Sequence, residues 1–158
     1  MPLSIGSTAP DFSLINTLGK IVSLKDYAGK QVVLLFFPFA NSSVCEEEMC
    51  TTRDNIKKYE ELDAEVLGIS VDSHYSLKLW VEKLNLNFPL LSDFNKEASQ
   101  KYDSYNEIHS PGKYDYKGVS KRSAFVIGKD GKIKYAEICE HTGLQPDYEA
   151  IKNSLKNN

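Results

Sequence analysis

Residues 32–50 of the chain read VVLLFFPFANSSVCEEEMC. The first six are continuously apolar, which is typical of a central strand buried on both faces of its sheet. Pro38 cannot donate to a sheet ladder and ends this strand. A polar loop then leads into a helix expected over residues 44–61, where apolar residues recur at spacings of three and four. The stretch therefore predicts a strand–loop–helix unit that delivers Cys45 into the first turn of the helix.

Similar patterns continue on both sides of this unit. Further strands are expected at residues 11–14, 21–24, 65–71, 88–91, 123–127 and 133–138. Further helices are expected at residues 76–84, 96–102 and 147–156. Turns at residues 16–19 and 128–131 make hairpins of the strands beside them. The polar, tyrosine-rich segment 102–121 is expected to be a long loop.

The order of these elements indicates the fold class. Strand–helix–strand units imply parallel strands with right-handed crossovers, and the late hairpin adds antiparallel strands. We therefore predict an α/β fold with a central mixed sheet, helices on both faces and an N-terminal β-hairpin extension. No repeat or linker interrupts the chain, so residues 1–158 are expected to form a single domain. Ligands bind such sheets beyond the carboxyl ends of the strands, so we expect the chemistry just after residue 37.

Composition argues against several classes of protein. The 158 residues are 41% hydrophobic and 26% charged, with a net charge of −3, which is not the composition of a disordered chain. No apolar run approaches the ~20 residues of a membrane span. The N-terminus lacks the basic and apolar regions of a secretory signal, and the mildly acidic balance argues against a nucleic-acid surface. We therefore expect a cytoplasmic protein.

Two residue types are scarce enough to be informative. The three cysteines, Cys45, Cys50 and Cys139, are too few for a disulfide scaffold and are expected as free thiols in a reducing cytosol. Of the nineteen basic residues only Arg53 and Arg122 are arginines. A guanidinium holds two acceptor atoms in one plane, which a lysine ammonium cannot do. The two arginines are therefore candidate functional residues.

Cys45 is the first candidate for chemistry. Amides at a helix N-terminus lack internal partners and carry partial positive charge, which stabilises a thiolate. Ser42 can accept from one of these amides, or donate to an anionic sulfur or a bound oxygen. Three glutamates follow and oppose a thiolate, so Arg122 is the natural candidate to offset their charge. The alternative is that Cys45 is a small apolar filler on the core face of the helix.

The motif Pro38-x-x-x-Ser42-x-x-Cys45 resembles the active-site signature of the peroxiredoxin family, in its less common serine form. Residues 6–14, residues 36–38, Trp80 with residues 88–93, and residues 122–131 also resemble family segments in the family's order. Within the family, the chain resembles the small thioredoxin-dependent enzymes near bacterioferritin comigratory protein and the one-cysteine alkyl hydroperoxide reductase E type. The resemblance implies a thioredoxin-like fold and peroxidase activity without a metal or organic cofactor.

The resemblance also implies roles for the residues of this motif. Cys45 would be the peroxidatic cysteine, whose thiolate attacks the O–O bond of a hydroperoxide and becomes a sulfenic acid. The amides near Val44 and Cys45, the Ser42 hydroxyl and Arg122 would bind the two peroxide oxygens. Pro38 would shield the thiolate from competing reactions.

Three further residues match supporting positions in the family. Glu48 would orient the arginine, and Trp80 would lie behind the site. Arg53 lies about 12 Å along the same helix face as Cys45, where an Arg-Asp pair supports the active-site network or a dimer surface. The three histidines have no ligand spacing, and no phosphate or dinucleotide loop is present, so neither a metal nor a cofactor is expected.

The resemblance leaves two roles open for Cys50. In members of the bacterioferritin comigratory protein type, a cysteine at this spacing forms an intramolecular disulfide with the peroxidatic cysteine. On an intact helix, Cα atoms five residues apart are about 8–9 Å from each other, whereas a disulfide needs less than about 7 Å, so the first turn would have to unwind. Alternatively, Cys50 is a buried helix residue, as in one-cysteine relatives that use an external thiol. Cys139 is expected to be a core or edge residue, with an intermolecular role left open.

The leading hypothesis is a thiol peroxidase for hydrogen peroxide and alkyl hydroperoxides, with thioredoxin or a glutaredoxin-like dithiol as its reductant. A thioredoxin-like disulfide exchanger would carry Cys-x-x-Cys, whereas this chain has Cys-x4-Cys. A binding or chaperone module that uses the fold without the chemistry is the rival from another class. Neither nucleic acid nor membrane is expected as a partner. The sequence leaves open the preferred peroxide, the reductant, and whether the protein is a monomer or a homodimer.

Overall fold

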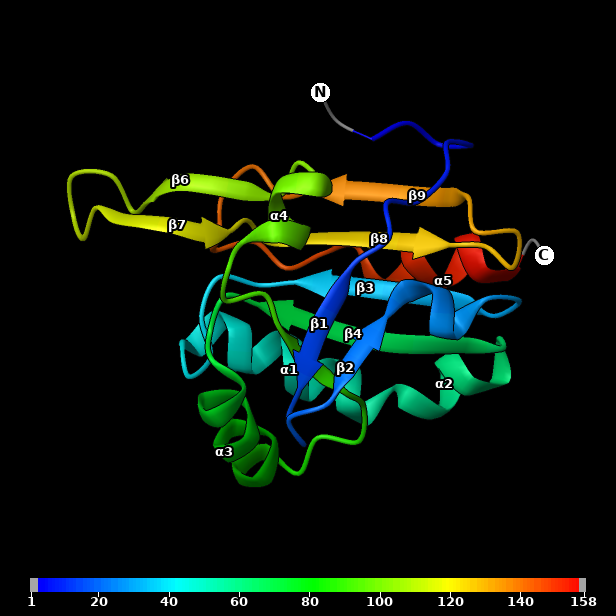
Figure 1. Cartoon of the computed structure of the whole chain (residues 1–158), viewed down its shortest axis with the longest axis horizontal. Helices are drawn as coiled ribbons and strands as arrows, with labels where there is room; N and C mark the ends of the chain where they lie inside the picture. Colours follow the sequence, from blue (N-terminus) through cyan, green and yellow to red (C-terminus); the bar gives the residue numbers. More distant parts are fainter. Residues whose placement is uncertain (1–2, 157–158) are drawn as a thin grey trace.

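Strand β3 (Gln31–Phe36) is the apolar strand expected from the sequence, and all six of its residues are buried. The computed structural model describes residues 3–156 and places β3 between β4 and β8 in a seven-stranded sheet of order β2-β1-β5-β4-β3-β8-β9 (Figure 1). The other strands of this sheet are β1 (Ser13–Asn16), β2 (Ile21–Ser23), β4 (Ala64–Ser70), β5 (Leu90–Ser92), β8 (Ser123–Ile127) and β9 (Ile133–Ile138).

The strand directions make the sheet mixed. β3 runs parallel to β4 and β4 runs parallel to β5, whereas β8 pairs antiparallel with both β3 and β9. The N-terminal hairpin β1–β2 is antiparallel and joins the sheet through β5. Parallel neighbours need crossover connections, and helical segments supply them here. The predicted α/β fold with a central mixed sheet is confirmed.

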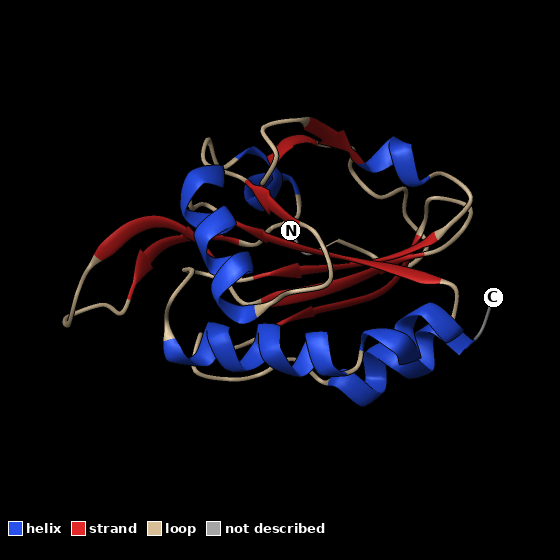
Figure 2. Cartoon of the chain, turned by 90° about the horizontal axis from the view of Figure 1, so that it is seen from below, coloured by secondary structure: helices blue, strands red, loops and turns tan. Residues whose placement is uncertain are grey.

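Helices cover both faces of the sheet (Figure 2). The first face carries α1 (Ser43–Asp54), α2 (Ile56–Glu61), α3 (His74–Leu84) and α5 (Tyr148–Lys156), and the second carries the 3-10 helix η1 (Leu24–Tyr27) and α4 (Glu97–Lys101). Side chains of β3 alternate between the two cores, as the pleat requires. Val33 and Leu35 pack into the first core, whereas Val32, Leu34 and Phe36 pack into the second. The loop that follows β3 therefore starts from a strand held on both sides.

The single helix expected over residues 44–61 is wrong, because the structure breaks it at Asn55. The backbone of Asn55 leaves the helical region, with φ −109° and ψ 9°. Its side-chain amide donates to the Thr51 carbonyl at 2.8 Å, which replaces the main-chain bond that a continuing helix would make there. Asparagine side chains compete with the helix backbone in this way.

The long loop expected over residues 102–121 is also wrong. This segment contains β6 (Tyr105–His109) and β7 (Tyr116–Ser120), which pair antiparallel as a separate two-stranded ribbon. The ribbon extends past the end of the main sheet in Figure 1. No residue of β6 is buried, and only the last three residues of β7 are. A strand with so little buried surface needs no apolar alternation, which explains why its sequence is typical of a loop.

The remaining expected helices and strands are present, with ends displaced by at most two residues. Among residues 3–156, no helix combines the length and apolar character needed to cross a membrane.

Candidate active site

A short loop carries the chain from β3 into α1. The Phe37 amide donates to the Ile69 carbonyl at 3.0 Å and makes the last bond of the strand pairing. Pro38 is buried, and Asn41 adopts the left-handed conformation with φ 69°, which asparagine tolerates better than most residues. Ser42 is the N-cap residue of α1. The loop therefore starts α1 directly beyond the carboxyl end of β3.

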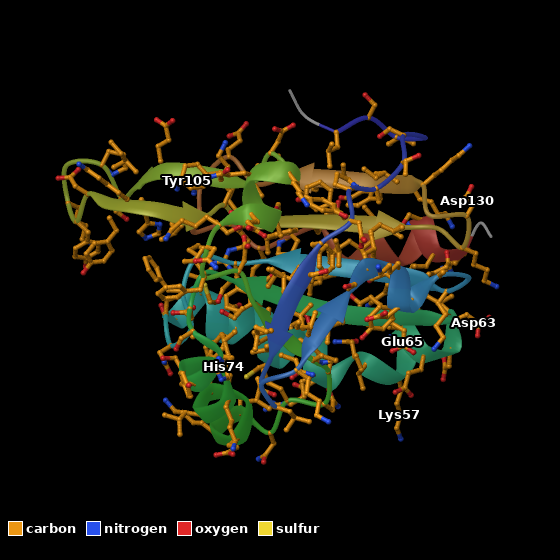
Figure 3. The ribbon with its side chains drawn as sticks, in the orientation of Figure 1. Lys57, Asp63, Glu65, His74, Tyr105 and Asp130 are labelled. Atoms are coloured by element: carbon orange, nitrogen blue, oxygen red, sulfur yellow. The ribbon has the colours of Figure 1, made fainter. Side chains whose placement is uncertain are left out.

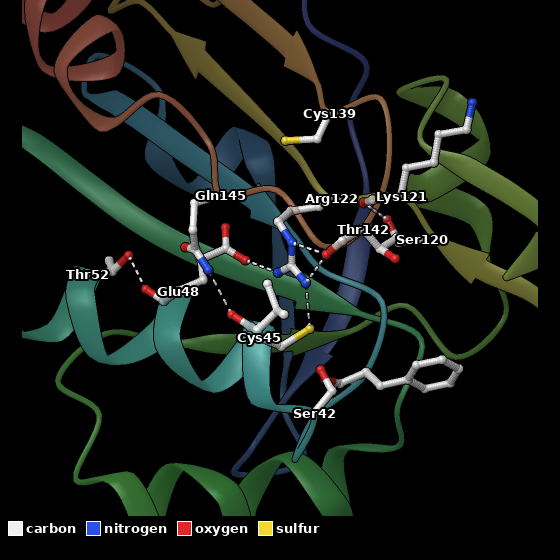
Figure 4. A network of polar contacts seen from close by, with 12 residues as sticks. Ser42, Cys45, Glu48, Thr52, Ser120, Lys121, Arg122, Cys139, Thr142 and Gln145 are labelled. Carbon is white, nitrogen blue, oxygen red and sulfur yellow. Dashed lines mark hydrogen bonds and ion pairs between the residues drawn. The ribbon is translucent and has the colours of Figure 1, made fainter. Parts of the chain in front are cut away.

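Arg122 reaches Cys45 because of the pairing between β3 and β8. Ser123 lies opposite Phe36, so the residue just before β8 lies beside the loop that follows β3. Nη2 of Arg122 is 3.1 Å from Sγ of Cys45 (Figure 4). Both side chains are buried, with Cys45 0% and Arg122 1% exposed. Residues far apart in the sequence thus bring a cation into direct contact with a thiol inside the protein.

Three more hydrogen bonds fix the guanidinium. Nε and Nη2 donate to the Thr142 carbonyl at 3.0 and 2.9 Å, and Nη1 donates to Oε1 of Glu48 at 2.6 Å. Glu48 lies three residues after Cys45 on α1, so its carboxylate and the sulfur share one face of the helix. A lysine ammonium could not reproduce this planar set of contacts.

Glu48 is a carboxyl group with no access to solvent. It is 0% exposed, and among the described residues its Oε2 has no hydrogen-bond partner. Burial raises the pKa of Glu48 to about 7, against the opposing effect of Arg122. Burial acts to lower the pKa of Arg122, but the negative charges of Glu48 and Cys45 raise it overall. Glu48 can therefore gain or lose a proton near neutral pH.

The start of α1 forms the other wall of the site. The first helical hydrogen bond runs from the Glu46 amide to the Ser42 carbonyl at 2.9 Å, so the amides of Val44 and Cys45 precede it and belong to the unpaired helix end. The Ser42 hydroxyl donates to the Phe39 carbonyl at 3.2 Å and does not cap the helix. These amides and the Arg122 guanidinium together could hold an anionic oxygen next to the sulfur.

The three cysteines are free thiols. Cys50 is half-buried on α1 and packs against the core cluster that contains Cys45. Because α1 is unbroken between them, these two thiols need local unwinding before they can bond. Cys139 is buried, with Sγ 4.0 Å from Oε2 of Glu137. Burial and the charge of Glu137 raise the pKa of Cys139 to about 11, which makes it a poor nucleophile.

Arg53 and Trp80 lie further from the sulfur. Arg53 donates from Nη1 to the Leu84 carbonyl at 2.5 Å and from Nε to Asp54 at 3.0 Å, which joins the end of α1 to the end of α3. Trp80 is buried, with its ring centroid 5.4 Å from that of Phe37. Within residues 3–156, no hydrogen bond joins either residue to Cys45 or Arg122.

Sequence reasoning missed two residues that complete the network. Thr142 contributes through its backbone carbonyl, which no side-chain pattern could reveal. Gln145 donates from Nε2 to the Val44 carbonyl at 3.0 Å and accepts from the Tyr148 hydroxyl. Both lie between β9 and α5, a segment that carries no motif of its own.

A second missed feature is an aromatic cluster of Phe39, His109 and Tyr116. The Phe39 ring lies edge-on to His109 at 5.1 Å and to Tyr116 at 5.6 Å between centroids. Burial and the positive charge of Arg122 lower the pKa of His109, which keeps it neutral at physiological pH. The ribbon therefore lies against the loop that leads to Cys45. Only the local density of aromatic residues in a polar segment signalled this contact.

No group of three or more His, Cys, Asp or Glu side chains in the described part of the chain is arranged to hold a metal ion.

Comparisons with known proteins find similarity over most of the chain. The model of the AhpC/TSA family matches residues 5–136. Alkyl hydroperoxide reductase E of Mycobacterium tuberculosis is 37% identical over 139 residues, covering 86% of each chain. Peroxiredoxin Bcp of Escherichia coli is 37% identical over 155 residues, covering 98% of this chain and 97% of that protein.

Solved structures share the fold over nearly the whole chain. Peroxidoxin BcpB of Mycobacterium tuberculosis superimposes with a TM-score of 0.82 at 27% identity and covers 96% of each chain. A PrxQ mutant of Xylella fastidiosa superimposes with a TM-score of 0.85 at 27% identity and covers 99% of this chain and 97% of that one. The predicted thioredoxin-like fold is therefore confirmed.

Replacement of Glu48 by glutamine tests the raised pKa. Between pH 4.5 and about 7 the native state holds a proton on Glu48 that the unfolded chain has lost, so wild-type stability falls as pH rises through this range. Glu48→Gln cannot ionise, so the wild type should lose up to about 3 kcal/mol relative to it over the same range. Urea unfolding of the reduced proteins at several pH values measures this difference. Glu60→Gln, at an exposed position of α2, should follow the wild type. Parallel curves for wild type and Glu48→Gln would contradict the assignment.

Proposed function

The chain belongs to the AhpC/TSA family and is a peroxiredoxin-type peroxidase, and on this premise we propose that Cys45 is its peroxidatic cysteine and Arg122 its catalytic arginine. The observation that carries the proposal is the 3.1 Å contact between Nη2 of Arg122 and Sγ of Cys45. It sets a fixed cation beside the nucleophile, at a helix start that offers amide donors.

In the first step the Cys45 thiolate attacks one oxygen of the hydroperoxide and the O–O bond breaks. The sulfur gains that oxygen and becomes a sulfenic acid, while the other oxygen leaves as hydroxide or alkoxide and takes a proton from solvent. Arg122, the Ser42 hydroxyl and the amides of Val44 and Cys45 bind the two oxygens and stabilise the charge that moves between them. The burial of Pro38 supports its role in keeping water away from the thiolate.

In the second step the Cys50 thiol attacks the sulfenic acid, releasing water and forming the Cys45–Cys50 disulfide. A dithiol protein such as thioredoxin or a glutaredoxin-like partner then reduces this disulfide by thiol–disulfide exchange and is itself oxidised. The half-buried position of Cys50 on the same helix supports this assignment, provided that the first turn of α1 unwinds. The unbroken helix equally favours a one-cysteine reaction in which an external thiol attacks the sulfenic acid.

We also propose hydrogen peroxide and alkyl hydroperoxides as substrates and the cytoplasm as the location. The names of the relatives, an alkyl hydroperoxide reductase and a peroxiredoxin, support this substrate class.

Glu48 holds Arg122 in place, whereas Arg53 and Trp80 stabilise the helices around the site.

Stopped-flow measurement of peroxide consumption by the reduced protein tests the proposal. The wild type should show a fast phase at one equivalent of hydrogen peroxide, and Cys45→Ser should abolish it because the nucleophile is gone. Cys139→Ser should keep the fast phase, since that thiol is protonated and lies outside the proposed reaction. A wild type without a fast phase would refute peroxidase activity and leave the binding or chaperone module.

Peptide mapping after one equivalent of peroxide tests the role of Cys50. We expect a peptide that links Cys45 to Cys50, and in Cys50→Ser a sulfenic acid that persists until an external thiol is added. A persistent sulfenic acid in the wild type, with Cys50 still free, would instead establish the one-cysteine reaction.

Arg122→Lys tests the guanidinium. Loss of the planar donor set should slow the oxidation of Cys45 by ten-fold or more, with the fold retained, because an oxyanion-type donor is worth roughly 3 kcal/mol or more. The matched change Arg53→Lys should have a much smaller effect, since the bonds of Arg53 run to the far end of α1. Equal rate constants for wild type and Arg122→Lys would remove Arg122 from the reaction.

A further inference from the structure

A hydrogen bond to the carboxylate of Asp72, two residues beyond the end of β4, holds the loop before Cys45. The Ala40 amide donates to Oδ2 of Asp72 at 2.8 Å. Ala40 stands two residues before the N-cap Ser42 and next to Asn41, whose left-handed conformation sets the turn into α1. A hydrogen bond to a charged acceptor is about twice as strong as a neutral one, so this contact has the strength to hold the turn.

Asp72 is itself fixed by two serines. The Ser70 hydroxyl donates to the same Oδ2 at 2.7 Å, and its oxygen accepts from the Asp72 amide at 3.3 Å. The Ser92 hydroxyl donates to the Asp72 carbonyl at 2.6 Å. Ser70 ends β4 and Ser92 ends β5, so the side chain of Asp72 is anchored to one buried strand and its backbone to another. The side chain thus serves as a rigid acceptor for a loop amide rather than as a mobile surface group.

From these contacts we propose that Asp72 is a positioning residue for the peroxidase reaction. By holding Ala40, it keeps the turn at Asn41 in place and therefore keeps the amides of Val44 and Cys45 directed at the site where the peroxide oxygens bind. It also keeps the buried sulfur of Cys45 covered. The inference rests on the proposed function in that the held loop matters for peroxide reduction, but the closed loop itself can be measured without peroxide.

Release of the loop should change two reactions of Cys45 in opposite directions. Alkylation by iodoacetamide requires the thiolate and access to the sulfur but no alignment of the oxygen-binding donors. Because the sulfur is 0% exposed, access limits the reaction and an opened loop makes it faster. Peroxide reduction requires the amides of Val44 and Cys45 to point at the peroxide oxygens, so the same opening makes it slower. A variant that unfolds more often would also expose the sulfur, but it would slow oxidation three-fold only if most of the protein were unfolded, which far-UV circular dichroism of the variant would detect.

The experiment compares Asp72→Ala, Asp72→Asn and a matched control with the reduced wild type. We expect Asp72→Ala to speed Cys45 alkylation by about ten-fold and to slow its oxidation by hydrogen peroxide by about three- to ten-fold, as loss of one charge-assisted bond implies. Asp72→Asn keeps an amide oxygen that can accept from Ala40, so it should restore both rates most of the way. Peptide mapping assigns the alkylated cysteine, and single-turnover kinetics give the oxidation rate.

Glu65→Ala is the control. Glu65 is the second residue of β4, whereas Ser70 is the last, and Figure 3 labels Glu65 close to Asp63. Among residues 3–156 its only ion pair is an exposed one with Lys30 at 4.0 Å. Removing this carboxylate should leave both reactions of Cys45 as in the wild type.

Each result decides the matter. Unchanged alkylation and oxidation in Asp72→Ala would overturn the proposal, and so would a parallel change of both rates that Asp72→Asn fails to rescue. A wild type that does not reduce peroxide would refute the proposed function alone, since faster alkylation of Asp72→Ala and its rescue by Asp72→Asn would still show that Asp72 holds the loop.

Discussion

A buried ion pair organises this protein: Arg122 and Glu48 lie in contact with almost no solvent exposure. Removing two charges from water costs several kcal/mol each, and only close contact together with further hydrogen bonds offsets that cost. The Thr142 carbonyl and the Cys45 sulfur supply those further bonds to Arg122. Loss of Arg122 would take away the hydrogen bond that the buried Glu48 accepts, and loss of Glu48 would leave the buried guanidinium with only the Thr142 carbonyl and the Cys45 sulfur. The site is therefore a structural element of the fold as much as a place for chemistry.

The strand register brings the members of this network together. Cys45 and Glu48 come from the helix after β3, and Arg122 comes from the residue before β8. Because β3 and β8 are antiparallel neighbours, the end of one strand and the start of the other lie at the same edge of the sheet. β4 runs parallel to β3, so its own carboxyl end, with Asp72 just beyond, reaches that edge as well. The pairing of three neighbouring strands thus brings three separate parts of the sequence to one edge of the sheet.

The sequence was sufficient to predict the main sheet, and it also predicted that Arg122 lies beside Cys45. Continuous apolar runs located β3 and the strand after Arg122, because both are buried on both faces. Apolar residues that recur at spacings of three and four located α1. Hydrophobic patterning failed for the ribbon β6–β7, whose strands bury too little surface to impose a pattern. It failed at Asn55, where a side-chain bond to Thr51 competes with the helix. Thr142 could not be found, because it acts through a carbonyl that every residue type carries.

The unbroken course of α1 has a consequence for the flow of electrons. A disulfide between Cys45 and Cys50 would remove the hydrogen bonds of the first helical turn and the contact of the sulfur with Arg122. The loss of these contacts would destabilise the oxidised form relative to the reduced form. Every 1.4 kcal/mol of this destabilisation raises the midpoint potential of a dithiol couple by about 30 mV. The intact helix of the reduced protein would thus stabilise the dithiol form relative to the disulfide form. A donor of modest reducing power would then suffice to reset the enzyme.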